Sequence, residues 1–158
     1  MISLPRPVLV FAALLVSVAP DPGAAQQPAA YHPGLGELMT AFVQPRHIKL
    51  GLAGNERNWP YAAYELGELT ETFDDIAELV PKHDNLPIPE MIASTVKEPM
   101  TALDAAIKAM DAAAFTKAYA DLTASCNACH QSADHPMIVI QVPTVSPFPD
   151  QDFRPPQK

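Results

Sequence analysis

Two cysteines and a histidine are the residues of this sequence whose types and spacing best suit chemistry. They stand together as Cys126-Asn127-Ala128-Cys129-His130, and the chain has no other cysteine. Each thiol can form a thioether with one haem vinyl group, and the adjacent imidazole can then bind the iron as its proximal ligand. Side chains three and four residues apart share one helix face, so Cys126, Cys129 and His130 can face one porphyrin edge. The motif therefore predicts one covalently attached haem c, with His130 on the iron.

Three other interpretations of the cysteine pair are weaker. A thioredoxin-like dithiol would sit in a βαβ pattern, which the surrounding sequence lacks. A zinc site would need further ligands, but there is no second cysteine pair and His135 is not at zinc-finger spacing. A structural disulfide would leave His130 without a role.

The first 25 residues have the organisation of a secretory signal. Arg6 precedes an apolar run over residues 8–18, and small residues lead up to Ala25. We expect cleavage after Ala25 and export to a bacterial periplasm. A membrane anchor is the alternative, but the run is short for a bilayer span, so we expect no membrane insertion after cleavage.

The composition is acidic, with 10 basic and 18 acidic residues and a formal net charge of −8. Loss of residues 1–25 removes one base, Arg6, and one acid, Asp21, so the net charge stays at −8. An acidic surface argues against nucleic acid and anionic membranes as partners. It permits basic partner proteins.

Apolar residues at helical spacing predict four helices, over about 34–53, 56–80, 88–110 and 112–130. Pro45 should interrupt the first helix, and Pro99 should kink or break the third. Asp111 suits the N-cap of the fourth, which places the haem motif in its last turn. Residues 81–87 form a loop in this prediction, and residues 26–33 a flexible lead-in. The haem domain then spans 34–132.

The chain after the motif, residues 133–158, is rich in proline and predicts an extended tail. Its apolar run over 137–142 should pack back over the helices or the haem edge; a strand that pairs with a partner is the alternative. Residues 148–153 suggest a surface turn. The acidic residues of the second helix, Glu65 among them, suggest a solvated face.

Four helices with short connections predict an all-α fold, an antiparallel four-helix bundle. With the haem motif at the end of the last helix, the sequence resembles the class II c-type cytochromes, the cytochrome c-prime group and its low-spin relatives. The resemblance covers about residues 34–130. It implies that Cys126 and Cys129 hold the haem, that His130 binds the iron, and that a homodimer forms through helices one and two. The long tail and the Gln44-Pro45-Arg46-His47 stretch depart from the family pattern.

The residue opposite His130 is left open by the sequence. In the family the distal position lies near the start of the first helix, where Met39 best suits a low-spin member. Met137 in the tail and His47 beyond Pro45 are alternatives, and so are His32, water or an empty site. A surface histidine is the other interpretation of His47. Basic residues that suit the haem propionates are Arg46, Lys49 and Arg57.

These features predict a periplasmic mono-haem cytochrome that carries one electron between redox proteins and is not an enzyme. A His/Met pair raises the reduction potential and suits electron transfer. An open sixth position would instead suit a five-coordinate haem protein that binds nitric oxide or carbon monoxide. A haem peroxidase ranks third, because no histidine–arginine pair can be assigned to a distal pocket.

Overall fold

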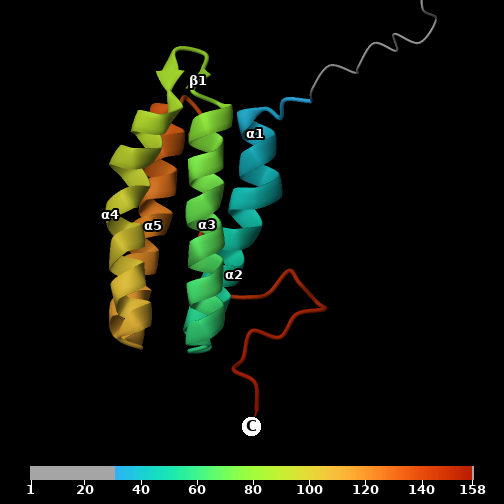
Figure 1. Ribbon diagram of the computed structural model, residues 1–158, viewed down its shortest axis with the longest axis vertical. Helices are drawn as coiled ribbons and strands as arrows, with labels where there is room; N and C mark the ends of the chain where they lie inside the picture. Colours follow the sequence, from blue (N-terminus) through green and yellow to red (C-terminus); the bar gives the residue numbers. More distant parts are fainter. Residues whose placement is uncertain (1–30, 158) are drawn as a thin grey trace, which may run out of the picture. The chain divides into compact units, whose positions relative to one another are not determined.

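A computed structural model describes residues 31–157 of the chain. The chain divides into two units, residues 1–31 and 32–158, and all but one of the described residues belong to the second. The predicted signal peptide lies outside the described residues, as does most of the predicted lead-in. The account below therefore concerns the second unit (Figure 1).

The described part of the chain is mostly helical, which agrees with the all-α prediction. The first helical stretch has three parts: α1 (Leu35–Leu38), the π-helical segment η1 (Met39–Val43) and α2 (Gln44–Asn55). The other helices are α3 (Trp59–Leu79), α4 (Ile88–Lys108) and α5 (Ala112–Ser132). Each lies within a few residues of a range that apolar periodicity predicts.

Pro45 changes the first helix locally without ending it. Proline has no N–H to bond the carbonyl four residues before it, and its ring crowds that carbonyl. The backbone widens ahead of it into η1, where the Gln44 N–H bonds the carbonyl of Met39, five residues back. Such π-helical turns are frequent at functional sites. The predicted interruption is thus a change of helix type, and the helix continues through α2.

Local capping sets the starts of α3 and α5. The Asn58 side chain accepts a hydrogen bond from the Tyr61 N–H, and Asp111 accepts from the N–H groups of Ala113 and Ala114. These bonds satisfy N–H groups that the first turn of a helix leaves without partners. Asp111 is therefore the N-cap that the sequence predicted.

Two details of the middle of the chain differ from expectation. Helix α4 runs unbroken past Pro99, which is itself buried, so the predicted break is wrong. Burial of the flanking Val96, Met100 and Leu103 holds the helix together across the missing hydrogen bond. The predicted loop before α4 contains a short antiparallel hairpin, β1 (Lys82–His83) and β2 (Leu86–Pro87).

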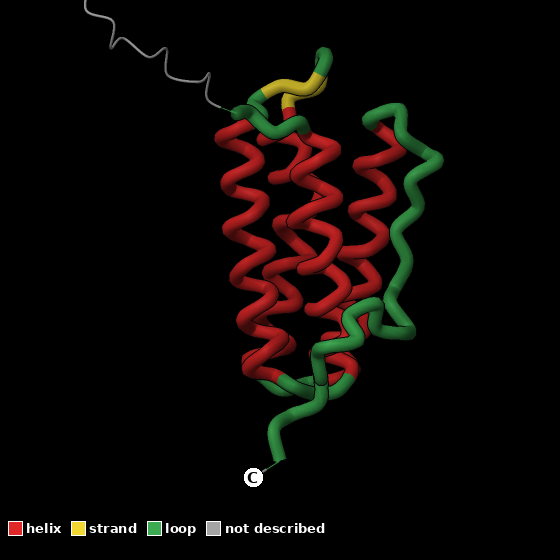
Figure 2. Tube along the Cα trace, turned by 90° about the vertical axis from the view of Figure 1, so that its right-hand side faces the viewer, coloured by secondary structure: helices red, strands yellow, loops and turns green. Residues whose placement is uncertain are grey.

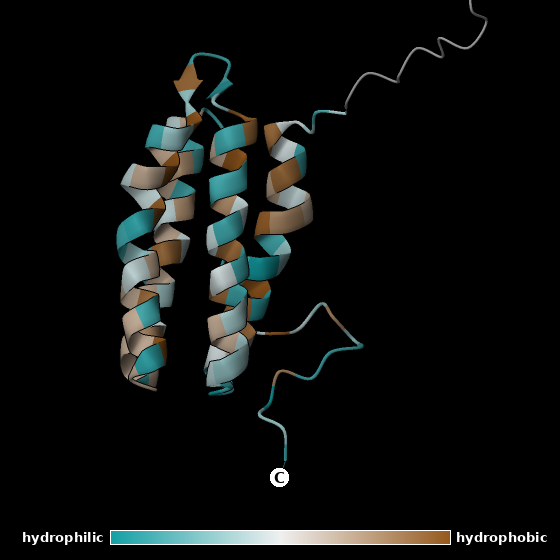
Figure 3. Cartoon of the chain, in the orientation of Figure 1, coloured by the Kyte–Doolittle hydropathy of each residue, from teal (hydrophilic) through white to brown (hydrophobic). Residues whose placement is uncertain are grey.

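The helices lie side by side, with α2 on α3, α3 on α4, α4 on α5, and α5 also in contact with α2. Figure 1 shows α1, the β1–β2 hairpin and the end of α5 at one end of this unit. The α2–α3 and α4–α5 connections lie at the other end. Figure 3 shows apolar and polar residues alternating along each helix. The largest fully buried side chains are Phe115, Leu50, Leu69, Ile76, Leu103 and Leu122.

Two glycines let α2 approach α5 closely. A Cβ atom added at Gly51 would lie 2.5 Å from the Tyr119 ring, and one at Gly54 would overlap the Phe115 ring. The rings of Phe115 and Tyr119 stack, with centroids 5.8 Å apart. These two aromatic side chains therefore fill the space that the glycines leave, and the fit fixes how α2 and α5 pack.

Two predictions about exposed residues are wrong. Glu65 is 3% exposed, and its burial raises the pKa of its carboxyl group. Lys49 and Arg46 act against this rise. Phe153, assigned to a surface turn, is 6% exposed and stacks on Tyr61 with ring centroids 5.5 Å apart. Both side chains are buried by packing between elements, which no local sequence pattern shows.

No helix of the described residues is both long enough and apolar enough for a membrane span.

Candidate haem-attachment site

The motif residues 126–130 lie in the last two turns of α5. Beyond them the chain reverses direction: Ala133 N–H bonds the Cys129 carbonyl, and His135 N–H bonds the His130 carbonyl at 2.8 Å. Between them Asp134 adopts a left-handed backbone conformation, with φ of 60°. This is how many helices end. The tail then descends alongside the helices to the opposite end of the unit (Figure 2).

Both motif cysteines are free thiols and half-buried. Burial, with a smaller effect of Cys129, raises the pKa of Cys126 to about 11. Burial also raises the pKa of Cys129. The two thiols are therefore protonated at neutral pH. Dithiol oxidoreductases have the opposite property, a thiol whose pKa is lowered so that it attacks disulfides. The site thus lacks the electrostatic character of a thioredoxin-like dithiol.

His130 is oriented by the tail. Its Nδ1 lies 2.9 Å from the Ile138 carbonyl oxygen. A carbonyl only accepts hydrogen bonds, so Nδ1 carries the proton and donates it. Nε2 then keeps its lone pair, and it has no hydrogen bond to a described residue. Iron-ligating histidines commonly have this arrangement, with one nitrogen fixed by a carbonyl and the other free for the metal. The residues present therefore fit a c-type haem.

Asn127 is a part of the site that sequence reasoning missed. Its amide Nδ2 donates to the Ile140 carbonyl at 2.9 Å, and its Oδ1 accepts from the Ile140 N–H at 2.7 Å. The motif pattern leaves this position free, so nothing in the sequence assigned it a role. Only the return of the tail along α5 brings its backbone partner into reach.

The three candidates for the distal position have different surroundings. Met39 is half-buried at the start of η1 and packs against the core. It lies in the first helical stretch at the end where α5 terminates (Figure 1). Met137 is 75% exposed, at the start of the extended tail. Met39 is thus the methionine that the helices hold in place.

His47 is not the surface histidine that its basic neighbours suggested, since it is 4% exposed. Its Nε2 lies 3.0 Å from the Thr123 hydroxyl and its Nδ1 3.0 Å from the Tyr119 hydroxyl. The Thr123 hydroxyl donates to a backbone carbonyl, so it accepts from Nε2–H, and Nδ1 is left to accept from Tyr119. Burial lowers the pKa of His47 to about 4. Both ring nitrogens are occupied in a neutral ring, so His47 is not free to bind iron.

Of the basic residues suggested for the haem propionates, Arg46 and Lys49 contact other parts of the chain, and Arg57 lies far from the motif along the helices. Arg46 donates to Thr72 and forms an ion pair with Glu68 at 3.0 Å, both on α3. The Lys49 ammonium lies over the Phe148 ring of the tail, 5.1 Å from its centroid. Arg57 lies in the α2–α3 connection, at the other end of the unit from the motif (Figure 1). This position does not favour Arg57 as a partner of the haem propionates.

Two further features complete the description. Within residues 31–157 no group of three or more His, Cys, Asp or Glu side chains is placed to hold a metal ion. A groove of about 630 Å³ lies between α3 and α4, lined by residues such as Leu66, Phe73 and Ile92. No motif residue lines this groove.

Comparisons with protein-family models, with curated proteins and with solved structures found no match for this chain.

Proposed function

We propose that this protein is an exported mono-haem c-type cytochrome that carries one electron between redox proteins in a bacterial periplasm. One observation carries the proposal: Cys126, Cys129 and His130 share the end of one helix, and His130 is held by Nδ1 with Nε2 free. A haem bound there would supply an iron that takes up and releases one electron. The proposal includes the antiparallel four-helix bundle of the class II cytochromes, which the packing of α2 to α5 supports.

In this proposal the chain's own residues have separate tasks. The Cys126 and Cys129 thiols would hold the haem through two thioether bonds. His130 would offer Nε2 to the iron, and the Ile138 carbonyl fixes the imidazole plane and its tautomer. Met39 is the proposed sixth ligand, because it is part of a packed helix whereas Met137 is exposed. Rigid ligands on both sides limit rearrangement when the iron changes oxidation state.

The test is the visible spectrum of the protein purified from a bacterium able to attach haem c. We expect one covalent haem per chain by pyridine ferrohaemochrome assay, and a sharp α band on reduction. The matched control is the double variant Cys126→Ser, Cys129→Ser, which should retain no covalent haem while its circular dichroism stays helical. A wild-type chain without covalent haem would overturn the proposal.

The sixth ligand is tested on the same material. Ferric His/Met haems show a weak far-red band, and we expect Met39→Ala to abolish it. Met137→Ala should leave it unchanged, because this side chain is outside the packed helices. A broad high-spin spectrum in the wild type, with rapid uptake of carbon monoxide, would instead favour the five-coordinate gas-binding protein.

A further inference from the structure

The tail is attached to the haem motif by side chains rather than by a β-sheet. Asn127, between the two cysteines, makes two hydrogen bonds to the backbone of Ile140, one through each end of its amide. Ile138, two residues earlier, accepts the hydrogen bond of His130 Nδ1. In an extended chain the carbonyls of residues two apart point the same way. One length of tail thus offers two carbonyls to α5, and Asn127 and His130 each bind one.

The register between tail and helix is set mainly by Asn127. An amide that binds both the N–H and the C=O of one residue fits a single position along the chain, because a shift by one residue would turn both groups away. The single hydrogen bond from His130 Nδ1 could be made to other carbonyls of the tail, so it does not by itself define the register. Asn127 is itself half-buried on α5 and not a ligand of the iron in the proposed site. It therefore determines which carbonyl reaches His130.

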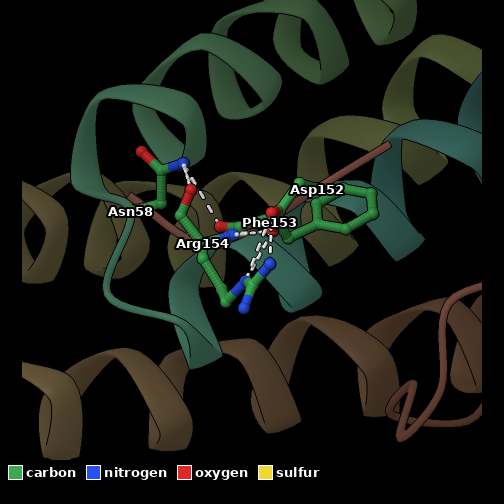
Figure 4. A network of polar contacts seen from close by, with 4 residues as sticks. All are labelled: Asn58, Asp152, Phe153 and Arg154. Atoms are coloured by element: carbon green, nitrogen blue, oxygen red, sulfur yellow. Dashed lines mark hydrogen bonds and ion pairs between the residues drawn. The ribbon is translucent and has the colours of Figure 1, made fainter. Parts of the chain in front are cut away.

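The other end of the tail is attached to the opposite end of the helices. Asn58, the N-cap of α3, donates through Nδ2 to the carbonyls of Phe153 and Arg154, at 3.2 and 3.1 Å (Figure 4). The buried Phe153 ring stacks on Tyr61. Arg154 folds back on Asp152 in an ion pair of 2.6 Å. The tail is therefore held at both ends, along the helices from the motif to the α2–α3 connection.

We infer that residues 136–154 act as a strap for the proximal side of the haem site, with Asn127 as the positioning residue that holds the Ile138 carbonyl against His130 Nδ1. The inference rests on the proposed function. A hydrogen bond from Nδ1 makes the imidazole a better electron donor, which stabilises the ferric state. The strap therefore lowers the reduction potential of the iron and fixes the orientation of its ligand.

The experiment compares Asn127→Leu with Gln131→Leu in the haem-loaded protein. Gln131 lies on the same helix one residue past the motif, is exposed and has no side-chain hydrogen bond in the described part of the chain. We expect Asn127→Leu to shift the reduction potential to more positive values. Exchange of the His130 Nδ1–H and of the Ile140 amide proton, followed by NMR, should become at least tenfold faster. Gln131→Leu should change neither quantity.

A partial variant keeps the test decisive if Asn127→Leu fails to fold. The neutral variant Asn127→Ser is too short to make both hydrogen bonds to Ile140, and it adds no charge beside the haem, so we expect a positive shift and faster Nδ1–H exchange. An unchanged potential and unchanged Nδ1–H exchange in a folded Asn127 variant would overturn the strap while leaving the cytochrome proposal intact. A wild-type chain with no haem would instead overturn the proposed function.

Discussion

Two histidines on neighbouring helices of this chain are held in opposite ways. His47 uses both ring nitrogens, one toward Tyr119 and one toward Thr123, and is buried. Within residues 31–157, His130 forms a hydrogen bond only through Nδ1, to the Ile138 carbonyl, and it is half-exposed. A ring with both nitrogens occupied is a structural element, whereas one with a free Nε2 is suited to bind a metal. The hydrogen bonds of the two histidines thus distinguish a structural residue from a candidate metal ligand, although the residue type is the same.

The burial of His47 makes stability depend on pH. Its pKa is about 4 in the folded chain, below the ordinary value of 6.5, so the unfolded chain binds more protons between these two values. The free energy of unfolding should therefore fall as the pH is lowered through this window, by about 3 kcal/mol in all. Urea unfolding at about pH 7 and about pH 4.5 measures the loss.

The matched variants for this prediction are His47→Gln and His135→Gln, since His135 is exposed. His47→Gln should show a clearly smaller loss of stability on acidification than the wild type, although it is less stable at neutral pH. His135→Gln should behave as the wild type does. Glu65 titrates in every variant, so its contribution cancels from the comparison. An equal pH dependence in His47→Gln and wild type would contradict the assignment.

At the scale of the elements, the contact between α2 and α5 governs how the first and last helices meet. Gly51 and Gly54 accept the rings of Tyr119 and Phe115 at a distance where no Cβ fits. His47, one turn before Gly51, bonds Tyr119 and Thr123 from the same side. The α1 and η1 segments, in contrast, precede this contact, and η1 packs on α3. The close contact with α2 therefore involves α5 residues that precede Cys126, and the last turns of α5 contact the tail instead.

Substitution of the two helical glycines tests this contact. In Gly54→Ala the new methyl group would overlap the Phe115 ring, so we expect a loss of about 1–3 kcal/mol in the free energy of unfolding. Gly67→Ala is the control, because nothing lies within 4 Å of the Cβ it would add in α3. It should raise stability by about 0.5–1 kcal/mol through helix propensity. Similar effects of both substitutions in urea unfolding would contradict the packing described here.

At the scale of the whole molecule, net charge would govern encounters with the redox partners of the proposed cytochrome. The formal charge is −8, and several acidic residues of α3, such as Glu71, Asp74 and Glu78, are exposed. An acidic protein attracts cations and repels anions over about 10 Å at moderate ionic strength. This field favours a basic partner surface.

The charge predicts opposite salt effects for two small redox reagents acting on the haem-loaded protein. Electron transfer with the cation hexaammineruthenium should become slower as salt is added, because screening weakens the attraction. Electron transfer with the anion ferricyanide should become faster, because screening weakens the repulsion. Stopped-flow rates over a series of salt concentrations measure both. If both rates changed with salt concentration in the same way, the surface around the haem would not be acidic, which would contradict this prediction.

The helices were predictable because their signals are local. Apolar spacing, the Asp111 cap and the position of Pro45 act over about one helical turn, so the sequence alone located all four helical stretches. The motif residues Cys126, Cys129 and His130 were recognised for the same reason, since their spacing is itself the signal. The prediction that the apolar run over 137–142 packs back was only partly right. Ile138 and Ile140 contact α5 through backbone hydrogen bonds, but Met137, Ile138, Val139 and Val142 leave 44–75% of their surface exposed.

Tertiary structure alone decided what these residues contact. His47 and Tyr119 are 72 positions apart, and Asn58 and Arg154 are 96 apart. No local pattern links such pairs, because the helices must first pack before their side chains can meet. For this reason the sequence did not predict that Glu65 and Phe153 are buried. It also did not predict that Asn127 binds the backbone of Ile140. The sequence thus determined the helices and the spacing of Cys126, Cys129 and His130, whereas packing decided which histidine keeps a ring nitrogen without a hydrogen bond among residues 31–157.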